Sequence, residues 1–523
     1  MPTDPDDRTG LWLGSMVEEA AAAHPDGLLV VDHGLDALPD APRAFTVAEL
    51  AGHIADLSAR LWAAGVRAGD HVALHKSANF DLYLLACAAA RIGAVPAMLS
   101  PALDADTVQR LLARLGRPHL LTDTGKLTGE LAGLPLDELA DRVLVTAGTH
   151  PGAVSLADLA DAPAVPAVRT APDGAALMTH TSGTTGTPKL VVHTARSLLG
   201  RLRPQERLAR AFREPERTLI HVSFVHSRLF LALAVLLPRG MPAIVVREGD
   251  AEHVAQICAE LRPGLIETHP NSFMEWEPLA SDPRRPFAGV KYFSSTFDAI
   301  HPGTIQHLLA ASDRRMPLFY QIYGQSECGP LAGRAYTRHG AENIDGRCLG
   351  HPMPGTSEIR VVSRGGEEPG PDTPGHIEVR TPGRALTYYG EDERYQEQVT
   401  DGWWRMGDVG YLTEQGCVHL LDREVDLIPA LRSTLEAEDT VLARLPELTE
   451  LVFVAGARQE PVPVVCTAGN RPLDPGRWRA AVRDLPAALA PPVQMKLDEL
   501  PRTATSKIKR RELAARLQAG EAA

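Results

Sequence analysis

Apolar runs of strand length alternate with helical patterns from about residue 45 to residue 300. The run HVALHK (71–76) precedes a helical stretch at 80–91, which is followed by the short apolar run AVPAML. The same order returns where TLIHVSF precedes the apolar segment 229–237 and then PAIVV. Such alternation is typical of α/β layers built on largely parallel sheets, so we expect an α/β fold.

The pattern changes twice towards the C-terminus. After Gly350, short alternating segments such as SEIRVV and GHIEVR lie between Gly/Pro turns and predict a smaller β-rich subdomain. Beyond Arg423 come two strand candidates, LTELVFVAGA and VPVVCTA, and the basic helical tail KIKRRELAARLQ. We therefore predict a large N-terminal domain over residues 1–424 and a small α+β domain over residues 425–523.

Composition and charge narrow the class of protein. A chain of 523 residues that is 44% hydrophobic can bury several cores, which agrees with two or more domains. The formal net charge of −13 argues against a nucleic-acid partner, which needs a basic face. The six cysteines are scattered without a C-x-x-C pair, so we expect neither a disulfide framework nor a zinc site, and a reducing compartment.

The hydropathy pattern predicts neither secretion nor a membrane span. The N-terminal segment MPTDPDDRTG is acidic and has no apolar run of the kind that a secretion signal needs. The longest apolar stretch, 82–99, contains Arg91 and a Gly-Ala-Val-Pro break, which favours a buried helix followed by a strand. We therefore expect a cytoplasmic protein without a membrane partner.

The hydroxyl-rich segment THTSGTTGTPK (179–189) is the first candidate for chemistry. Glycines let the backbone approach an anion closely, hydroxyls donate hydrogen bonds to phosphate oxygens, and lysine adds positive charge. The spacing of its glycines and lysine differs from that of the G-x-x-x-x-G-K-[ST] loop. From the residues alone, phosphate binding and a polar surface turn both stay open.

Six motifs in chain order resemble those of the adenylate-forming superfamily, which contains acyl-CoA synthetases, peptide-synthetase adenylation domains and luciferases. The hydroxyl-rich segment is similar to the signature loop of this family, and the resemblance covers about residues 45 to 513. The fold that it implies is a large AMP-binding domain with a small, mobile C-terminal lid domain. The other five motifs are IYGQSE (322–327), LGHPMPG (349–355), DGWWRMGDVGYL (401–412), DREVDLI (422–428) and LPRTATSKIKRREL (500–513).

The resemblance implies a reaction in which a carboxylic acid attacks the α-phosphate of ATP, giving an acyl-adenylate and pyrophosphate. The protein then acts by positioning and by electrostatic stabilisation. In this scheme Glu327 holds Mg²⁺ through carboxylate oxygens, which this hard cation prefers. The cradle for the β- and γ-phosphates consists of Thr181, Ser182, Gly183, Thr184, Thr185 and Gly186, with Lys189 as a supporting contact.

Contacts to the nucleoside follow from the same resemblance. Tyr323 stacks on the adenine, and Ser326 lies near the α-phosphate. Asp408 accepts hydrogen bonds from the ribose hydroxyls, with Arg423 assisting.

Two further residues are implied to act at the reacting atoms. His226, in SFVHSRLF, matches the aromatic or histidine gate beside the acyl pocket. Lys507 reaches in from the lid domain and bridges the α-phosphate and the attacking carboxylate. Together with Glu327, these residues form the implied catalytic set.

Several positions at which this sequence departs from the family pattern correspond to the segments that deliver CoA in CoA ligases. Leu431 and Arg432 stand where CoA ligases have a glycine-rich loop that helps to form the pantetheine tunnel. Val425 and Ser506 also replace the usual residues of the hinge and of the position before the catalytic lysine. Because the adenylation residues are nearly intact, we expect the first half-reaction to be retained and the acceptor to differ from CoA.

The substrate pocket also departs from the pattern. Phe224 and Val225 stand where adenylation domains for α-amino acids carry an aspartate that holds the amine, so an α-amino acid is disfavoured. The segment SSTFD (294–298) stands where glycines usually line the acid pocket, which indicates an unusual substrate.

We therefore predict an ATP- and Mg²⁺-dependent, AMP-forming ligase that activates a small aryl or acyl acid and transfers it to a nucleophilic acceptor such as an amine. The alternatives are an acyl- or aryl-CoA ligase, a nitrite-activating diazotase of the same family, a luciferase-type oxygenase and a non-catalytic nucleotide-binding protein. Pyrophosphate exchange separates the last alternative from the enzymes. The identity of the acid, the acceptor and the oligomeric state stay open.

The implied role of Lys507 gives a direct prediction. We expect Lys507→Ala to lower the rate of adenylate formation by about 10²–10³, because one electrostatic stabiliser of the transition state is lost. ATP should still bind, since the phosphate loop is untouched. The check is pyrophosphate exchange beside nucleotide binding, and near-normal exchange in the variant would contradict the assignment.

Overall fold

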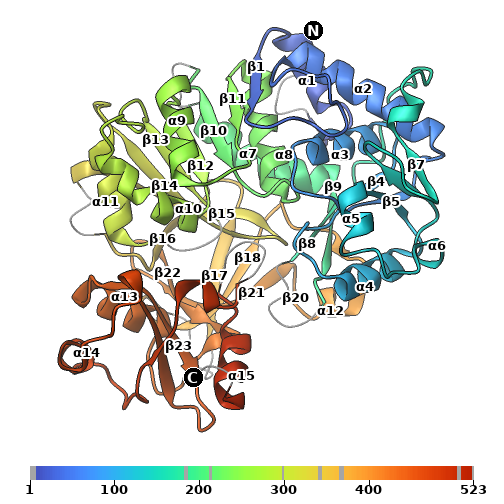
Figure 1. Cartoon of the computed structure of the whole chain (residues 1–523). Coiled ribbons are helices and arrows are strands. Elements are labelled where there is room, and N and C mark those ends of the chain that lie inside the picture. The colour runs from blue at the N-terminus through green and yellow to red at the C-terminus, as the bar shows by residue number, and fades with distance from the viewer. Residues whose placement is uncertain are drawn as a thin grey trace.

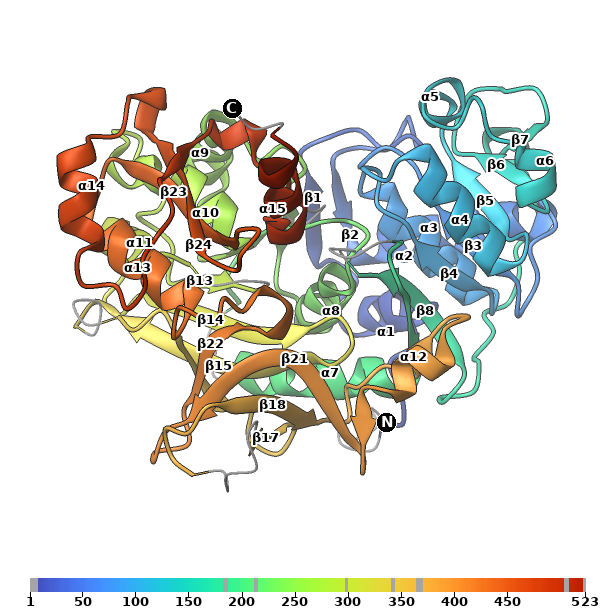
Figure 2. The ribbon, with the colours of Figure 1, turned by 90° about the horizontal axis from the view of Figure 1, so that it is seen from below.

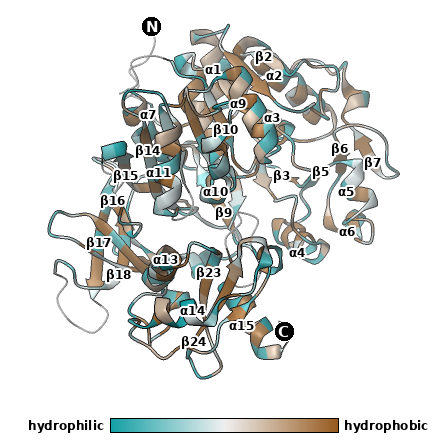
Figure 3. Ribbon diagram, turned by 60° about the vertical axis from the view of Figure 1, so that its left-hand side comes forward, coloured by the Kyte–Doolittle hydropathy of each residue, from teal (hydrophilic) through white to brown (hydrophobic). Residues whose placement is uncertain are grey.

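Two large sheets and one small sheet form the framework of the chain, and helices pack against them (Figure 1). The computed structural model describes residues 8–181, 187–210, 215–296, 300–339, 344–363, 370–502 and 508–520. The central strands, such as β10 (Thr218–His221), are rich in hydrophobic residues, as Figure 3 shows. The predicted α/β class is confirmed.

The first large sheet contains eight strands within the described residues and is parallel at its centre. Its central strands read as continuous apolar runs because both faces are covered. In spatial order the strands are β19 (Thr387–Tyr388), β9 (Leu190–Thr194), β8 (Ala175–His180), β4 (Val95–Met98), β3 (His71–Leu74), β5 (His119–Thr122), β6 (Val143–Val145) and β7 (Ala153–Ser155).

The second large sheet is parallel in one half and antiparallel in the other. The parallel strands are β1 (Leu28–Val31), β11 (Ala243–Val245), β10, β12 (Leu265–Thr268), β13 (Tyr292–Ser295) and β14 (Leu318–Gln325). The antiparallel strands are β2 (Ala44–Thr46) at one edge and, beyond β14, β15 (Gly329–Thr337), β16 (Cys348–Pro352), β22 (Val418–Arg423), β21 (Trp403–Leu412), β18 (Gly375–Arg380), β17 (Glu358–Ser363) and β20 (Val399–Thr400). The predicted β-rich segment thus extends the large sheet.

Helices of the large part connect and cover these strands, and their ends carry ordinary capping signals. Asp104, for example, accepts a hydrogen bond from the backbone N–H of Thr107 at the start of α4, and Gly116 ends that helix in the left-handed region. These helices are α1 (Met16–Ala23), α2 (Val47–Ala63), α3 (Asp81–Arg91), α4 (Ala105–Leu115), α5 (Thr124–Thr128), α6 (Leu136–Leu139), α7 (Ala195–Ala209), α8 (Ser227–Leu236), α9 (Ala251–Leu261), α10 (Pro270–Trp276), α11 (Pro302–Ala311) and α12 (Asp392–Gln396).

The small C-terminal unit has a sheet and hydrophobic clusters of its own. Strands β23 (Leu448–Ala455), β24 (Pro461–Thr467) and β25 (Val493–Gln494) pack with helices α13 (Thr434–Arg444), α14 (Pro475–Val482) and α15 (Arg510–Ala519). Its buried clusters contain only residues from Ile428 onward, and the division at residues 424 and 425 stays a prediction. The unit lies beside β22, the strand that leads into it, as Figure 1 and Figure 2 show.

A disulfide joins Cys348 on β16 to Cys417 in the turn before β22, with their Cα atoms 6.7 Å apart. The scattered cysteines excluded a disulfide framework, but they gave no sign of this single bond. The two positions lie 69 residues apart, and only the antiparallel pairing of β16 with β22 brings them together. The sulfurs lie within 4.8 Å of a His419 ring nitrogen, but as a disulfide they are not the thiolates that a metal ion would need.

Among the described residues, no helix combines the length and the hydrophobicity that a transmembrane segment requires.

Asp422 makes a contact between the large part and the small unit. Its carboxylate accepts hydrogen bonds from the backbone N–H of Thr434, at 3.0 and 3.2 Å, where α13 begins. Burial raises the pKa of Asp422 to about 6, although the hydrogen bonds from Thr434 and the charge of Arg510 oppose this rise. The folded state therefore favours the protonated carboxyl of Asp422 near pH 5.

This raised pKa predicts how Asp422 contributes to stability as the pH changes. The stabilising contribution is fully present below the unfolded-state pKa of about 4 and is lost as the pH rises through about 6. We expect the melting temperature of the wild type to fall relative to that of Asp422→Asn when the pH rises from about 4 to 7. Parallel melting curves for the two proteins over this range would contradict the expectation.

Candidate active site

The sequence-predicted site residues fall into two groups. Ser182, Gly183, Thr184, Thr185, Gly186 and Lys507 lie outside the described residues, so their roles stay predictions. The structure describes the others, which lie on strands, beside strand ends or, for His226, at the start of α8: Thr181, Lys189, His226, Tyr323, Ser326, Glu327, Asp408 and Arg423.

The two ends of the hydroxyl-rich segment are held together at their base. β8 and β9 pair in antiparallel register, with His180 opposite Leu190. The backbone N–H of Thr181 donates to the carbonyl of Lys189 at 3.0 Å, and the N–H of Lys189 donates to Oγ1 of Thr181 at 3.2 Å. Thr181 and Lys189, which flank the undescribed residues 182–186, are therefore held next to each other.

Glu327 is a buried carboxylate, 3% exposed, that lies just beyond the end of β14. The hydroxyl of Tyr388 donates to its Oε1 at 2.5 Å, and Nζ of Lys189 donates to the same hydroxyl at 2.8 Å. Nζ of Lys189 also lies 3.6 Å from Oε1. The motifs identified Glu327 and Lys189, but no sequence signal indicated Tyr388, which comes from β19 in the other large sheet.

Tyr388 acts as a fixed donor in this contact. Burial, with the neighbouring charge of Glu327, raises the pKa of Tyr388 far above its usual range, so the phenol stays protonated. A carboxylate offers about four acceptor positions, so this one hydrogen bond leaves Glu327 capacity for a cation. Its oxygen donors and buried position fit Mg²⁺, which prefers carboxylate ligands.

Tyr323, Asp408 and Arg423 form a second group, in which Asp408 and Arg423 lie on the neighbouring strands β21 and β22 and Tyr323 lies on β14 of the same sheet. The hydroxyl of Tyr323 on β14 donates to Oδ2 of Asp408 on β21 at 2.5 Å. Asp408 pairs directly with Arg423 across β21 and β22. Burial, with the charge of Asp408, raises the pKa of Tyr323 well above its usual range. The structure thus brings together the residues that resemblance assigned to adenine and ribose.

The turn that carries Ser326 and Glu327 is fixed by contacts that the motif did not reveal. The indole Nε1 of Trp404 donates to Oε1 of Gln325 at 2.8 Å, and Nε2 of Gln325 donates to the carbonyl of Met406 at 3.1 Å. A Cβ on Gly324 would lie 2.2 Å from the carbonyl oxygen of Gly329, so only glycine fits there.

His226 caps the N-terminus of α8, where its Nδ1 accepts a hydrogen bond from the backbone N–H of Arg228 at 3.1 Å. Burial, with the nearby cationic groups Arg201 and Arg228 and the neighbouring His269, lowers the pKa of His226 to about 3. The imidazole is therefore neutral at pH 7. The positive charge of Arg201 makes this region favourable for an anion, whereas Arg228 is paired with the carboxylate of Glu267.

The two arginines are held by partners far away in the sequence. Arg201 is 1% exposed and donates through Nε to the carbonyl of Gly383 at 2.7 Å. Arg228 contacts both the carboxylate of Glu267 and the amide oxygen of Gln205. Sequence reasoning missed both arginines: Arg201 lies outside the motifs, and Arg228 lies two residues after His226 in SFVHSRLF but was given no role there.

A cavity of about 280 Å³ opens at the carboxyl ends of β10, β11 and β12, the edge where ligands of open α/β sheets bind. It is lined by the segment that precedes His226, including Phe224 and Val225, by Val246 and Arg247 after β11, and by His269 before α10. Of SSTFD, residues 294–296 belong to the described chain, and Phe297 and Asp298 lie outside it.

Comparison with known proteins places this geometry in a family. A family profile described as AMP-binding enzyme matches residues 17–389. The 3-amino-2-hydroxy-4-methoxybenzoate diazotase of Streptomyces cremeus is 46% identical over 97% of this chain and 96% of its own length. The 3-aminoavenalumate diazotase of a Streptomyces species is 27% identical over 80% of this chain and 75% of its own length.

The fold also matches solved structures of such enzymes. The crystal structure of an anthranilate CoA ligase in complex with anthranoyl-AMP superposes with a TM-score of 0.83 at 18% sequence identity, covering all of both chains. At this identity the match concerns the fold, and it agrees with the predicted large sheet domain.

The contact between Tyr388 and Glu327 gives a prediction with a matched control. We expect Tyr388→Phe to lower the rate of adenylate formation about tenfold and to raise the Mg²⁺ concentration for half-maximal rate, because a buried carboxylate loses its donor. Tyr389→Phe is the control, since the Tyr389 hydroxyl lies near His71 and has no contact with Glu327. Equal effects of the two substitutions would contradict this role.

Proposed function

The chain belongs to the AMP-binding enzyme family, and within that family we propose that it is a diazotase, which activates nitrite with ATP and transfers the nitrosyl group to an aromatic amine. ATP-dependent, AMP-forming ligation is what the family performs. The observation that carries the proposal is 46% identity over 97% of the chain with a diazotase of an aminobenzoate.

The proposed reaction needs no oxidant or reductant. A nitrite oxygen attacks the α-phosphorus of ATP, the bond to the bridging oxygen breaks, and pyrophosphate leaves. The amine nitrogen then attacks the nitrosyl nitrogen, the bond from that nitrogen to the phosphate oxygen breaks, and AMP leaves. Loss of both amine hydrogens and the remaining nitrite oxygen as water gives the diazonium ion. Atoms and charge balance for one amine, one nitrite and one ATP.

The residues of the site suit the first step of this scheme. The positive charge of Arg201, held by a backbone carbonyl beside neutral His226, favours a small anion such as nitrite, whereas Arg228 is paired with Glu267. Tyr323 and Asp408 lie together where the nucleoside is expected, and Glu327 offers carboxylate oxygens for Mg²⁺. When bound there, Mg²⁺ supplies charge neutralisation for the phosphates.

The structure of the region expected to deliver CoA supports an acceptor other than CoA. Leu431, which replaces a glycine of the tunnel loop, is 5% exposed and belongs to the hydrophobic cluster of the small unit. Ser433, two residues later, caps α13 and also donates to the carbonyl of Leu421 at 2.5 Å. A segment anchored in this way replaces the thin glycine loop of CoA ligases with fixed side chains.

The proposal predicts pyrophosphate exchange that depends on nitrite. The wild type is tested with nitrite and with a panel of aryl acids, fatty acids and amino acids, and we expect exchange with nitrite to exceed exchange with every acid. With an aminobenzoate added at about pH 8, the diazonium product should be trapped as an azo dye by a naphthol. A reaction without enzyme controls for spontaneous nitrosation.

Exchange with an aryl acid in place of nitrite, without azo dye, would contradict the diazotase proposal. That result would favour activation of the acid itself, with an amine or CoA as acceptor, and the product formed with each acceptor would tell these apart.

A further inference from the structure

The cavity beside His226 has the size of a site for one aromatic ring, and its walls are partly apolar and partly polar, the polar part including His269, Asn271 and the exposed Glu275. Its apolar lining includes Leu82 of α3, Phe224, Val225 and Val246, all of which are buried. A volume of about 280 Å³ lies just below the range of roughly 300–1,000 Å³ that is usual for small-molecule sites. A single substituted ring therefore fits the cavity better than a long acyl chain does.

In the proposed reaction, the first step uses only nitrite and ATP, and neither of them accounts for this cavity. Nitrite has three atoms, so it occupies the place of a carboxylate and does not extend into a ring pocket. The amine, by contrast, must bring its nitrogen to the nitrosyl group while its ring is held. The cavity is therefore available to the second substrate, and this inference rests on the proposed function.

One cationic side chain lies at the wall of the cavity. Arg247 follows β11, lines the cavity and is half-buried. Its Nε donates to Oε1 of exposed Glu248 at 2.6 Å, and within the described residues this contact leaves the two Nη groups available to a ligand. A guanidinium with available Nη donors is suited to a carboxylate, which it can bind through two hydrogen bonds.

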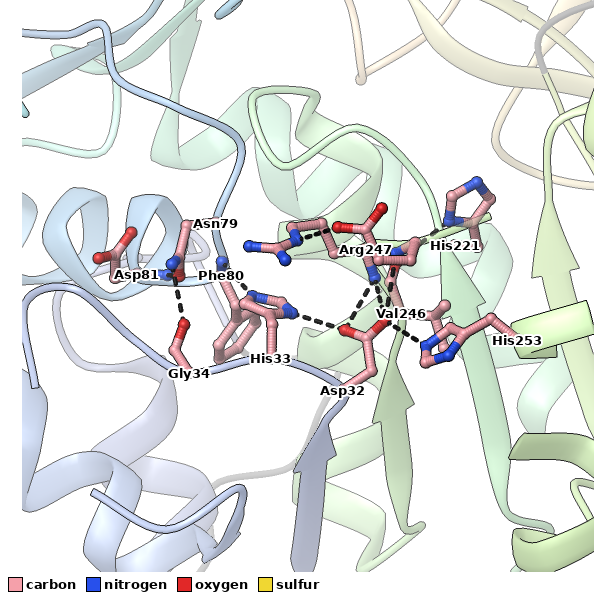
Figure 4. Close-up of polar contacts among 11 residues, drawn as sticks. Asp32, His33, Gly34, Asn79, Phe80, Asp81, His221, Val246, Arg247 and His253 are labelled. Carbon is pink, nitrogen blue, oxygen red and sulfur yellow. Dashed lines mark hydrogen bonds and ion pairs between the residues drawn. The ribbon is translucent and has the colours of Figure 1, made fainter. Parts of the chain in front are cut away.

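A buried carboxylate fixes the backbone of Arg247. Both oxygens of Asp32, which is 3% exposed in its side chain, accept from the Arg247 N–H at 3.0 Å, and Oδ2 also accepts from the Glu248 N–H at 3.1 Å. His33 and His253 donate to the same carboxylate at 2.5 and 3.0 Å. Figure 4 shows Asp32 between these two histidines, next to Arg247.

The same network ties Arg247 to the opposite wall. Nε2 of His33 accepts from the backbone N–H of Phe80 at 3.0 Å, so its hydrogen lies on Nδ1, which donates to Asp32. Phe80 immediately precedes α3, and its ring packs edge-on against Phe224 with centroids 6.3 Å apart. The backbone after β11, the start of α3 and the segment after β10 are thus held in one arrangement (Figure 4).

We propose that this cavity binds the aromatic amine, that Arg247 pairs with a carboxylate on its ring, and that Asp32 is a positioning residue for Arg247. The substrate class is then an aromatic amine that carries an acidic group, such as an aminobenzoate. Arg247 determines specificity for that group, and the apolar walls hold the ring with its amine towards the nitrosyl-adenylate.

The experiment compares two amines, 3-aminobenzoate with a carboxylate and 3-aminophenol without one, in the azo-dye assay. For Arg247→Met we expect the ratio of kcat/KM for aminobenzoate to that for aminophenol to fall about 10- to 100-fold, mainly through KM for aminobenzoate. This range corresponds to one lost charge-assisted pair. Arg315→Met, which removes an exposed arginine outside the cavity, is the matched control and should keep the wild-type ratio.

Asp32→Asn tests the positioning role, and we expect it to lower the same ratio by a smaller factor. The ratio is independent of the amount of folded protein, so a loss of stability alone does not move it. An unchanged ratio in Arg247→Met, or equal losses with both amines, would overturn the assignment of the carboxylate site.

Failure of this inference and failure of the proposed function give different results. Nitrite-dependent pyrophosphate exchange in the wild type needs no amine, so its absence refutes the diazotase proposal and, with it, the assignment of the cavity to the amine. If exchange is present and Arg247→Met keeps the wild-type preference, the diazotase proposal stands and the cavity assignment is refuted.

Discussion

The hydrogen bond from Tyr388 to Glu327 joins the two large sheets at the carboxylate on which the proposed metal chemistry depends. Tyr388 belongs to the eight-stranded sheet, whereas Glu327 follows β14 of the other sheet. The backbone supports the same contact, because the N–H of Ala385 donates to the Glu327 carbonyl at 2.7 Å. A carboxylate that is 3% exposed is costly unless it is paired. The packing of the two sheets and the geometry of the site therefore depend on each other.

The same logic extends to the charges around the cavity. Arg201 and Arg228 are kept in place by a carbonyl and by Glu267, and burial, with these groups nearby, holds His226 neutral. The carboxylate of Asp32 accepts a hydrogen bond from the backbone N–H of Arg247 and so fixes the backbone there, while the guanidinium of Arg247 is not part of this contact. Arg201 thus lies near His226, where the small anion is proposed to bind, and Arg247 lies at the wall of the cavity. This arrangement suits two anionic substrates that must meet without sharing one site.

Much of the fold and part of the site could be predicted from the sequence. Apolar periodicity located strands such as β3 and β10, and the motifs identified Glu327, Asp408 and Tyr323, because these signals are local. The partners of these residues could not be found in this way. Tyr388 is 61 residues from Glu327, Arg247 is 215 residues from Asp32, and Cys417 is 69 residues from Cys348. Contacts between residues so far apart in the sequence depend on the order of the strands in the sheets. The hydrophobic periodicity of the sequence does not reveal that order.

The central claim is that nitrite is the group that attacks ATP. Transfer of ¹⁸O from labelled nitrite to the phosphate of AMP measures this attack directly. With nitrite carrying ¹⁸O in both oxygens, one turnover with an aminobenzoate should give AMP with one ¹⁸O in its phosphate, and the second label should leave in water. Mass spectrometry of the AMP gives the answer. AMP without label, formed while the aminobenzoate is consumed, would contradict the account, since the activated oxygen would then come from the carboxylate of the amine itself.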